Sequence, residues 1–340
     1  MLRRALPLIV AGAFAGSALA SCGSGGFTAP AVLKLAPEPG TAPSPSTVPF
    51  GRVLHLDASG AEGIVVDGAS RYAVVATRAP DRLQVVDLTT FSKDRVLVSP
   101  GGARHLKLAG PEQVIVPGED TNTVSVLTIP DGKLVSQVHV PRQPHNVTQL
   151  PDGVIVTIDE LANSVTASRG DTVLGTIGGI IQPGGATEEG GYAAVVEVRG
   201  RILDVFAGDP FKLVGRVAVG EGPTHDRGLG HGTVAVADTT GNKVFIVRVS
   251  SKPKVLTSFD VPHQPYGLAV DKTRNRLWVA SSGDNILYEY AIGKPGRTPT
   301  LIRSFPTVQQ PNSLAVIPST GQVIVAGSTK VDATLEEITP

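Results

Sequence analysis

Polar and aromatic residues recur at matching positions along this chain, roughly forty residues apart. One series comprises Glu62, Arg104, His105, His145, His225, Tyr266 and Asn312. Further along the same units lies a second series of carboxylates, Glu119, Asp159, Glu197 and Asp238. Imidazole nitrogens and carboxylate oxygens are ligands that zinc takes in tetrahedral sites. If the fold gathers these residues, the sequence predicts a zinc site made of His105, His145, His225, Asp159 and Asp238.

A ligand other than a metal ion would use the remaining polar residues of the first series. If the repeats surround a central channel, we expect Glu62, Arg104, Tyr266 and Asn312 to line a ligand-binding site at the mouth of that channel, next to the histidines. Two of the histidines, His105 and His225, sit one residue later in their units than His145, and neighbouring residues of a strand face opposite ways. The three imidazoles therefore need not converge, and a solvated polar lining stays open as an interpretation.

The spacing of these residues follows from a repeating unit. Seven units begin at Glu62, Arg104, His145, Gly184, Thr224, Tyr266 and Asn312. The first unit divides into apolar runs at 63–67, 72–77, 83–88 and 95–99, separated by turn residues. A period near forty with four short strands is typical of a β-propeller blade. We therefore predict an all-β, seven-bladed propeller over residues 51–340.

The last unit contains only three evident strands, at 313–317, 322–326 and 334–338. A spare strand at 52–57 precedes the first unit. If this N-terminal strand pairs into the last blade, the ring closes and an exposed sheet edge is removed. The sequence thus predicts closure between the two ends of the repeat region.

Recurring dipeptides join the units, and an asparagine marks many of the hairpins. The joints read Gln143-Pro144, Gln182-Pro183, Gln264-Pro265 and Gln310-Pro311, and the hairpin asparagines include Asn122, Asn163, Asn242 and Asn285. Together with the run 277–280 (Leu-Trp-Val-Ala), these features resemble the YVTN-repeat, or YncE-like, β-propeller family. The fourth unit departs from the pattern, because Arg199-Gly200-Arg201 stands where the asparagine turn should fall.

The resemblance implies the fold more firmly than a function, since members of the family differ in role. The repeats also distantly resemble propeller lactonases. On that basis Glu62, Arg104, His145 and Arg227 form a hydrolase alternative, in which they polarise a carbonyl and activate water. None of the common enzyme motifs for serine hydrolases, zinc proteases or nucleotide binding is present, so catalysis is the lesser expectation.

The first residues of the chain read as an export signal. Arg3 and Arg4 precede an apolar stretch at 6–19 that is too short for a membrane anchor. The stretch ends in Leu-Ala-Ser-Cys at 19–22, which resembles the lipobox of bacterial lipoproteins. We predict a signal peptide at 1–21 and lipidation of Cys22, the single cysteine of the chain. Acyl chains at that residue would hold the protein on the outer face of the cell membrane.

The composition of the chain indicates a linker after the export signal and limits the kinds of partner. Residues 22–50 are rich in proline, serine and threonine, which predicts a flexible tether between anchor and propeller. The formal net charge of the chain is zero, which argues against nucleic acid as a partner. We expect a monomeric binding or scaffold protein of the cell envelope, with an envelope protein, a polymer or a small ligand as its partner. Zinc is the one cofactor that the histidines suggest, and a metal-carrier role is the first alternative.

Overall fold

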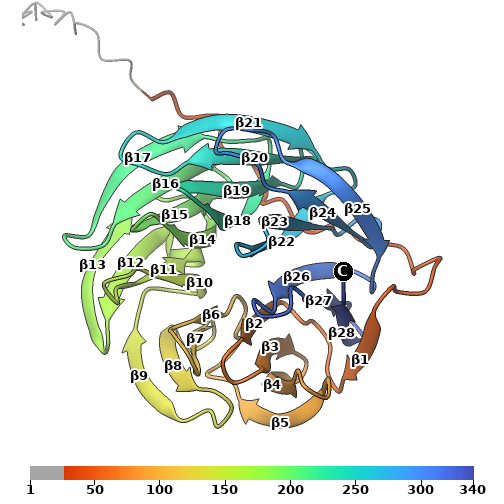
Figure 1. Ribbon diagram of the computed structural model, residues 1–340. Helices are drawn as coiled ribbons and strands as arrows, with labels where there is room; N and C mark the ends of the chain where they lie inside the picture. Colours follow the sequence, from red (N-terminus) through yellow and green to blue (C-terminus); the bar gives the residue numbers. More distant parts are fainter. Residues whose placement is uncertain (1–26) are drawn as a thin grey trace, which may run out of the picture.

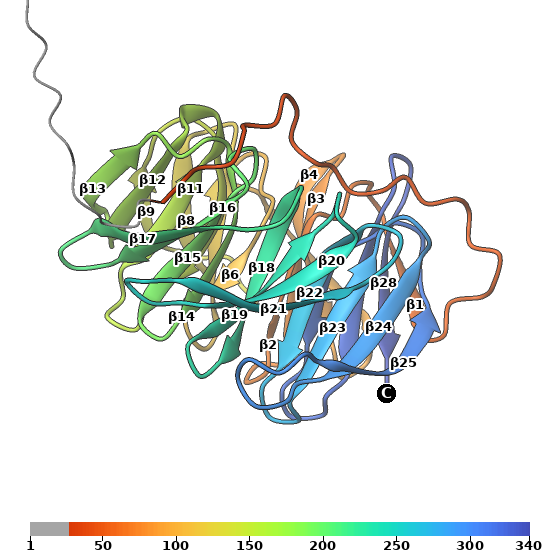
Figure 2. The same ribbon diagram turned by 90° about the horizontal axis from the view of Figure 1, so that it is seen from above.

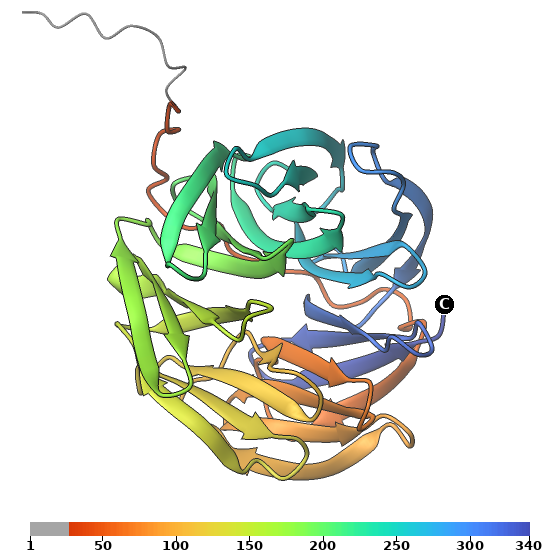
Figure 3. The same ribbon diagram turned by 60° about the vertical axis from the view of Figure 1, so that its left-hand side comes forward.

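The computed structural model describes residues 27–340; the predicted signal peptide and Cys22 lie outside this range. Seven four-stranded antiparallel sheets stand around a central channel (Figure 1), and the same ring is seen obliquely in Figure 3. The prediction of an all-β, seven-bladed propeller is confirmed. Among residues 27–340 no helix has the length and apolar character needed to cross a membrane.

Each blade runs from its innermost to its outermost strand in chain order, except the last. Blades one to three are formed by β2 (Gly63–Asp67), β3 (Tyr72–Arg78), β4 (Asp81–Asp87), β5 (Ser92–Val98); β6 (Lys107–Leu108), β7 (Gln113–Gly118), β8 (Thr123–Thr128), β9 (Leu134–His139); and β10 (Pro144–Gln149), β11 (Ile155–Asp159), β12 (Ser164–Arg169), β13 (Thr172–Gly178). One 3-10 turn, η1 (Glu160–Ala162), follows β11.

Blades four to six repeat this arrangement. They are formed by β14 (Pro183–Glu189), β15 (Tyr192–Glu197), β16 (Ile202–Ala207), β17 (Lys212–Ala218); β18 (Pro223–Gly230), β19 (Thr233–Asp238), β20 (Lys243–Arg248), β21 (Lys254–Asp260); and β22 (Pro265–Asp271), β23 (Arg276–Ser281), β24 (Ile286–Ala291), β25 (Thr300–Pro306). Blade seven contains β26 (Pro311–Val316), β27 (Val323–Ser328), β28 (Ala333–Ile338) and β1 (Arg52–Leu56).

The N-terminal strand closes the ring as predicted. β1 pairs antiparallel with β28, in a register that runs from Arg52 opposite Glu337 to Leu56 opposite Ala333. An ion pair of 2.6 Å joins the Arg52 guanidinium to Glu337. The Leu56 side chain is buried between blades seven and one. Strands from the two ends of the propeller thus share one sheet.

The core consists of seven apolar clusters, one at each interface between neighbouring blades. Valine is the commonest residue in them, followed by alanine and leucine; the β-branched valine side chain packs well on pleated sheets. Trp278, the one tryptophan, is buried between blades six and seven. Each blade therefore depends on its neighbours for burial, and the channel walls are the inner edges of these packed sheets.

The recurring asparagine and glutamine of the sequence meet in the structure. At four blade joints the backbone N–H of the glutamine donates to the side-chain oxygen of the preceding hairpin asparagine, at 2.8–2.9 Å: Gln143 to Asn122, Gln182 to Asn163, Gln264 to Asn242 and Gln310 to Asn285. All eight residues have positive φ, between 49° and 64°. This bond fixes how the chain enters the next blade, and hence where the innermost strand begins.

The joint between blades four and five is built differently. Arg201 takes the positive-φ position of the hairpin (φ 57°), so the β15–β16 hairpin forms without the asparagine. With no asparagine oxygen available, the joint is held from the other side. Asp238 at the end of β19 accepts hydrogen bonds from the backbone N–H groups of Glu221 and Gly222. The missing asparagine of the fourth unit therefore changes how this one joint is held and leaves the hairpin of the blade intact.

Residues 27–50, predicted to be a flexible tether, lie along one face of the ring (Figure 2). The Leu33 N–H donates to the Arg199 carbonyl in blade four at 2.9 Å. The Gly40 N–H donates to Ser282 in blade six at 2.7 Å, and the Ala42 N–H to Gln310 at the start of blade seven at 3.1 Å. The extended backbone that proline favours leaves amide groups free, and these find partners on the blade joints. We call residues 33–43 the strap.

Candidate binding site at the channel mouth

The strap crosses the channel mouth at which the innermost strands begin, so the mouth is a pair of pockets beneath it. A larger pocket of about 660 Å³ is lined by Glu62 and Asn312, among others. A smaller one of about 40 Å³ is lined by Arg104, His145, His225 and Tyr266. Glu38 of the strap lines both pockets. The four predicted ligand-binding residues therefore lie at one mouth, divided between two neighbouring pockets.

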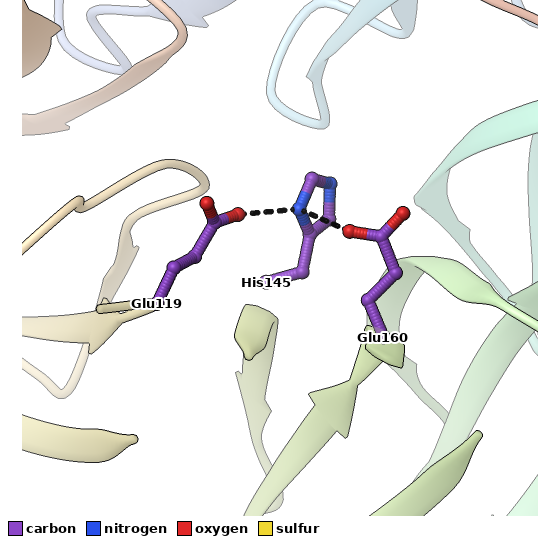
Figure 4. A group of neighbouring side chains, drawn as sticks. All are labelled: Glu119, His145 and Glu160. Atoms are coloured by element: carbon purple, nitrogen blue, oxygen red, sulfur yellow. Dashed lines mark hydrogen bonds and ion pairs between the residues drawn. The ribbon is translucent and has the colours of Figure 1, made fainter. Parts of the chain in front are cut away.

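His145 lies between two carboxylates (Figure 4). Its Nδ1 is 2.8 Å from Glu119 Oε1 and 3.2 Å from Glu160 Oε2. The ligand atoms of the three residues all lie within 4.8 Å of one another. His145 comes from β10, Glu119 directly follows β7 and Glu160 opens η1 after β11, so blades two and three build the cluster. One imidazole nitrogen facing two carboxylates can hold a shared proton or a cation.

Two arginines balance the carboxylates of the mouth. Arg78 Nη2 is 2.7 Å from Glu119 Oε2, and Arg104 Nε is 2.5 Å from Glu62 Oε2 without the alignment of a hydrogen bond. Burial alone would raise the pKa of Glu119, but the hydrogen bonds from His145 and Arg78, with the charge of Arg104, bring this pKa down to about 2. Burial raises the pKa of the Glu38 carboxyl, against the attraction of Arg104. The positive charges of the two arginines therefore balance negative charges of the carboxylates at the mouth.

The other two predicted imidazoles form a hydrogen-bonded pair across the channel. His105 Nε2 and His225 Nε2 are 3.3 Å apart, and His225 Nδ1 is 3.2 Å from the Tyr266 carbonyl oxygen. A carbonyl can only accept, so His225 Nδ1 carries the proton and His225 Nε2 accepts from His105. Burial brings the pKa of His225 to about 3 and that of His105 well below its ordinary value, so both rings are neutral. The pair links blades two and five through the channel.

The three histidines thus lie together: the ring centroid of His105 is 4.7 Å from that of His145 and 4.8 Å from that of His225. Their nitrogens do not face one point, because His105 and His225 bind each other while His145 faces the carboxylates. The structure thus brings the three imidazoles together without aiming their nitrogens at one point, and a zinc ion at the mouth stays a prediction. A cation would meet His145, Glu119 and Glu160 instead.

The two predicted aspartates lie elsewhere. Asp159 is fully buried in its own blade and accepts hydrogen bonds from Ser164 and Thr166. Asp238 holds the joint between blades four and five. Both end a second strand as expected, but Asp159 faces its own hairpin, and Asp238 faces the preceding joint and its own turn. The predicted hydrolase set is also divided, since Arg227 lines a cavity at the opposite mouth while Glu62, Arg104 and His145 do not.

Glu38 and Glu160 were not predicted to lie at the mouth, and Glu119 was not placed among the metal ligands. The sequence pattern pointed to Asp159, whereas the carboxylate at the mouth is that of the next residue, Glu160. A shift of one residue along a strand moves a side chain to the other face of the sheet. Glu38 is the one carboxylate of the segment 22–50, and nothing in the repeat pattern connects that segment to the channel.

No family model and no curated protein matches this chain. Solved structures are similar in fold. A chain of the mitotic checkpoint complex has a TM-score of 0.72 at 11% identity, with 92% of this chain and 99% of that chain covered. The RRP9 WD40 repeats give 0.70 at 11% identity, covering 87% and 99%, and virginiamycin B lyase from Staphylococcus aureus gives 0.67 at 13%, covering 84% and 99%. Similarity at these identities establishes the propeller fold.

Proposed function

We propose that this chain is a binding protein of the cell envelope, a YncE-like propeller held at the outer face of the membrane by lipidation of Cys22. Its ligand-binding site is the channel mouth beneath the strap. The observation that carries the proposal is the convergence there of charged side chains, among them Glu38, Glu62 and Arg78, around a pocket of about 660 Å³. Pockets of this size are typical of small-molecule sites. The similar propellers include WD40 repeats and a chain of a protein complex, which also supports a protein partner.

The membrane part of the proposal is tested with Cys22→Ser. We expect the wild-type chain in the membrane fraction of the source cell, labelled by a clickable palmitate analogue. The variant should be unlabelled and released from the membrane. Retention of the unlabelled variant in the membrane would contradict anchoring at this residue.

The binding part is tested with a photo-crosslinking amino acid introduced in living cells. Lys330 lines the larger pocket at the mouth and is exposed, so a crosslinker there should give a discrete adduct of defined mass. Val173 on β13 has comparable access to solvent on the outside of the ring and is the matched control. Identical patterns from both positions, or no adduct from Lys330, would contradict a partner at the mouth.

A divalent cation is the second candidate ligand, favoured by the Glu119–His145–Glu160 cluster. Ligands about 2.1 Å from a tetrahedral zinc ion lie roughly 3.4 Å from each other. The observed separations of 2.8 and 3.2 Å from His145 Nδ1 are slightly shorter than that. Glu38, which lines the same small pocket, is a carboxylate available for a further position.

Calorimetric titration of the full chain with zinc tests this candidate. We expect one binding event that is lost in His145→Ala and kept in His231→Ala, whose histidine is exposed in the β18–β19 turn. Binding that survives His145→Ala would place the metal elsewhere, and the absence of binding would remove the metal from the proposal. Either result leaves the crosslinking test of the mouth unaffected.

A further inference from the structure

A second cavity opens at the opposite mouth of the channel, where the innermost strands end. Its volume is about 420 Å³, and innermost strands of six blades contribute to it. We call it the basal cavity. The hydrogen-bonded pair His105–His225 lies between it and the strap-covered mouth. His225 lines the covered mouth, whereas Arg227, two residues further along β18, lines the basal cavity.

Aliphatic residues make up about half of the lining of the basal cavity, and polar residues such as Thr187 and Thr273 contribute to the rest. The aliphatic residues include Ile64, Val66, Leu108, Val270, Leu314 and Val316, from four different blades. An apolar wall of this kind binds hydrocarbon, and the volume falls within the range of small-molecule sites. The volume and the aliphatic part of the lining therefore suit a small ligand with an apolar body.

Three cations line the same cavity: Lys107 from β6, Arg227 from β18 and Lys272, which follows β22. Within residues 27–340 the Lys107 ammonium takes part in no hydrogen bond or ion pair, and the Arg227 guanidinium donates only to the carbonyl of the preceding Asp226, at 3.1 Å. Burial and the nearby charge of Arg227 lower the pKa of Lys107 well below its ordinary value, and burial lowers the pKa of Arg227. Two partly buried cations that line one cavity are costly unless an anion compensates their charge.

The acidic groups nearby compensate these two cations only in part. Asp226 is fully buried and attracts both Lys107 and Arg227, but neither of its carboxylate oxygens has a hydrogen-bond partner among the described residues; burial raises its pKa to about 7 against that attraction. At the rim, Asp271 pairs with Arg274 at 3.0 Å and Glu188 accepts from the Gly191 N–H at 2.9 Å. The rim lysine, Lys272, lies 3.5 Å from Glu189. Positive charge therefore remains in excess at Lys107 and Arg227.

We propose that the basal cavity is a second binding site, which takes a small organic carboxylate with its charged end at Lys107 and Arg227 and its hydrocarbon along the aliphatic walls. A guanidinium binds a carboxylate through two parallel N–H groups, and an ammonium adds a third donor. The site lies on the face away from the strap, and it is independent of the ligand bound beneath the strap.

Calorimetry with hexanoate on the full chain in detergent tests this site, with detergent alone as the blank. Hexanamide has the same size without the charge, and inorganic phosphate supplies charge without hydrocarbon. We expect hexanoate to bind at least about tenfold more tightly than either, the factor of a charged hydrogen bond. Equal binding of hexanamide would reduce the site to an apolar pocket, and tighter binding of phosphate would make it a simple anion site; both outcomes overturn the proposal.

Lys107→Met and Arg227→Gln should each weaken hexanoate binding at least about tenfold. Lys254→Met makes the same change of charge at an exposed position of the outer strand β21 and should leave binding unchanged. A cation retained only for folding would lower the melting temperature when removed, whereas loss of an unpaired, partly buried ammonium should not. Unaltered hexanoate affinity in both Lys107→Met and Arg227→Gln would place the ligand elsewhere.

Discussion

Glu119 and Asp159 are both buried, yet their surroundings shift their pKa values in opposite directions. Donors from Arg78 and His145 hold the pKa of Glu119 at about 2 against the effect of burial. Asp159 receives only two hydroxyl hydrogen bonds, so burial prevails and its pKa rises to about 7. The two residues end second strands in adjacent blades. Their different titration comes from the side chains that tertiary packing supplies.

Glu119→Gln should destabilise the protein at neutral pH. The depressed pKa means that the unfolded chain takes up this proton first, so the stabilisation is present above about pH 4.5 and is lost as pH falls toward 2. At pH 7 we expect the free energy of unfolding to fall by up to about 3 kcal/mol, at about 1.4 kcal/mol per pKa unit. Urea unfolding at pH 7 and pH 3.5 measures it, and the difference from wild type should shrink at the lower pH. Exposed Glu221→Gln is the control.

Asp159→Asn should have the opposite effect. The folded pKa is raised, so between about pH 4 and pH 7 the unfolded state ionises while the folded state does not, and wild-type stability declines as pH rises. Asparagine keeps an oxygen for the Ser164 and Thr166 hydroxyls and carries no charge. We expect the variant to gain up to about 4 kcal/mol over wild type at pH 8. Urea unfolding that shows the same difference at pH 4 and pH 8 would contradict this.

At the scale of elements, the strap acts as an additional connection among the blades. It contacts blade four at Arg199, blade six at Ser282 and the start of blade seven at Gln310. Ala42 is buried and Gly40 packs against Gly283, while Leu35 is 82% exposed. The strap thus has a contacting side and a free side, and Glu38 lies over the mouth.

Replacing residues 33–43 by a glycine-serine segment of equal length should uncover the mouth. We expect His145, which is 7% exposed, to react faster with diethyl pyrocarbonate. The melting temperature should fall by a few degrees, because several hydrogen bonds of about 1 kcal/mol each are removed. Mass spectrometry of the modified peptide gives the rate. Leu35→Ala is the control with an unchanged rate, and unchanged reactivity in the replaced chain would show that the strap does not shield the site.

At the scale of the whole molecule, closure depends on one strand. β1 is separated from β28 by nearly the entire propeller in sequence, yet it completes blade seven. Without it, β28 would present an unpaired edge, which invites pairing with another chain. The interface between blades seven and one also takes the Leu56 side chain from this strand.

Deleting residues 50–58 should therefore open the ring. We expect the melting temperature to fall by at least about 5 °C, with concentration-dependent aggregation in light scattering. The substitution Leu56→Ala alone should cost about 2–4 kcal/mol, as for other buried leucines, whereas partly exposed Val53→Ala should cost far less. An unchanged melting temperature in the deletion would refute closure by β1.

The sequence by itself determined the blade repeat, the seven units and the closing strand. These features are encoded locally, since apolar runs, turn residues and the Gln-Pro joints lie within each unit of about forty residues. The predicted strand 63–67 coincides with β2, and the predicted closing strand 52–57 differs from β1 by one residue. The sequence also brought the three histidines to one region, because equivalent positions of the repeat face one channel.

Only the tertiary structure decided which groups meet there. His145 faces Glu119 and Glu160 rather than His105 and His225, and Asp238 serves a blade joint. A shift of one residue changes the side of a strand, and the period of the repeat cannot resolve it. The strap was beyond prediction for another reason: its contacts join residues separated by as many as 270 positions, and nothing in its own composition records the surface on which it lies.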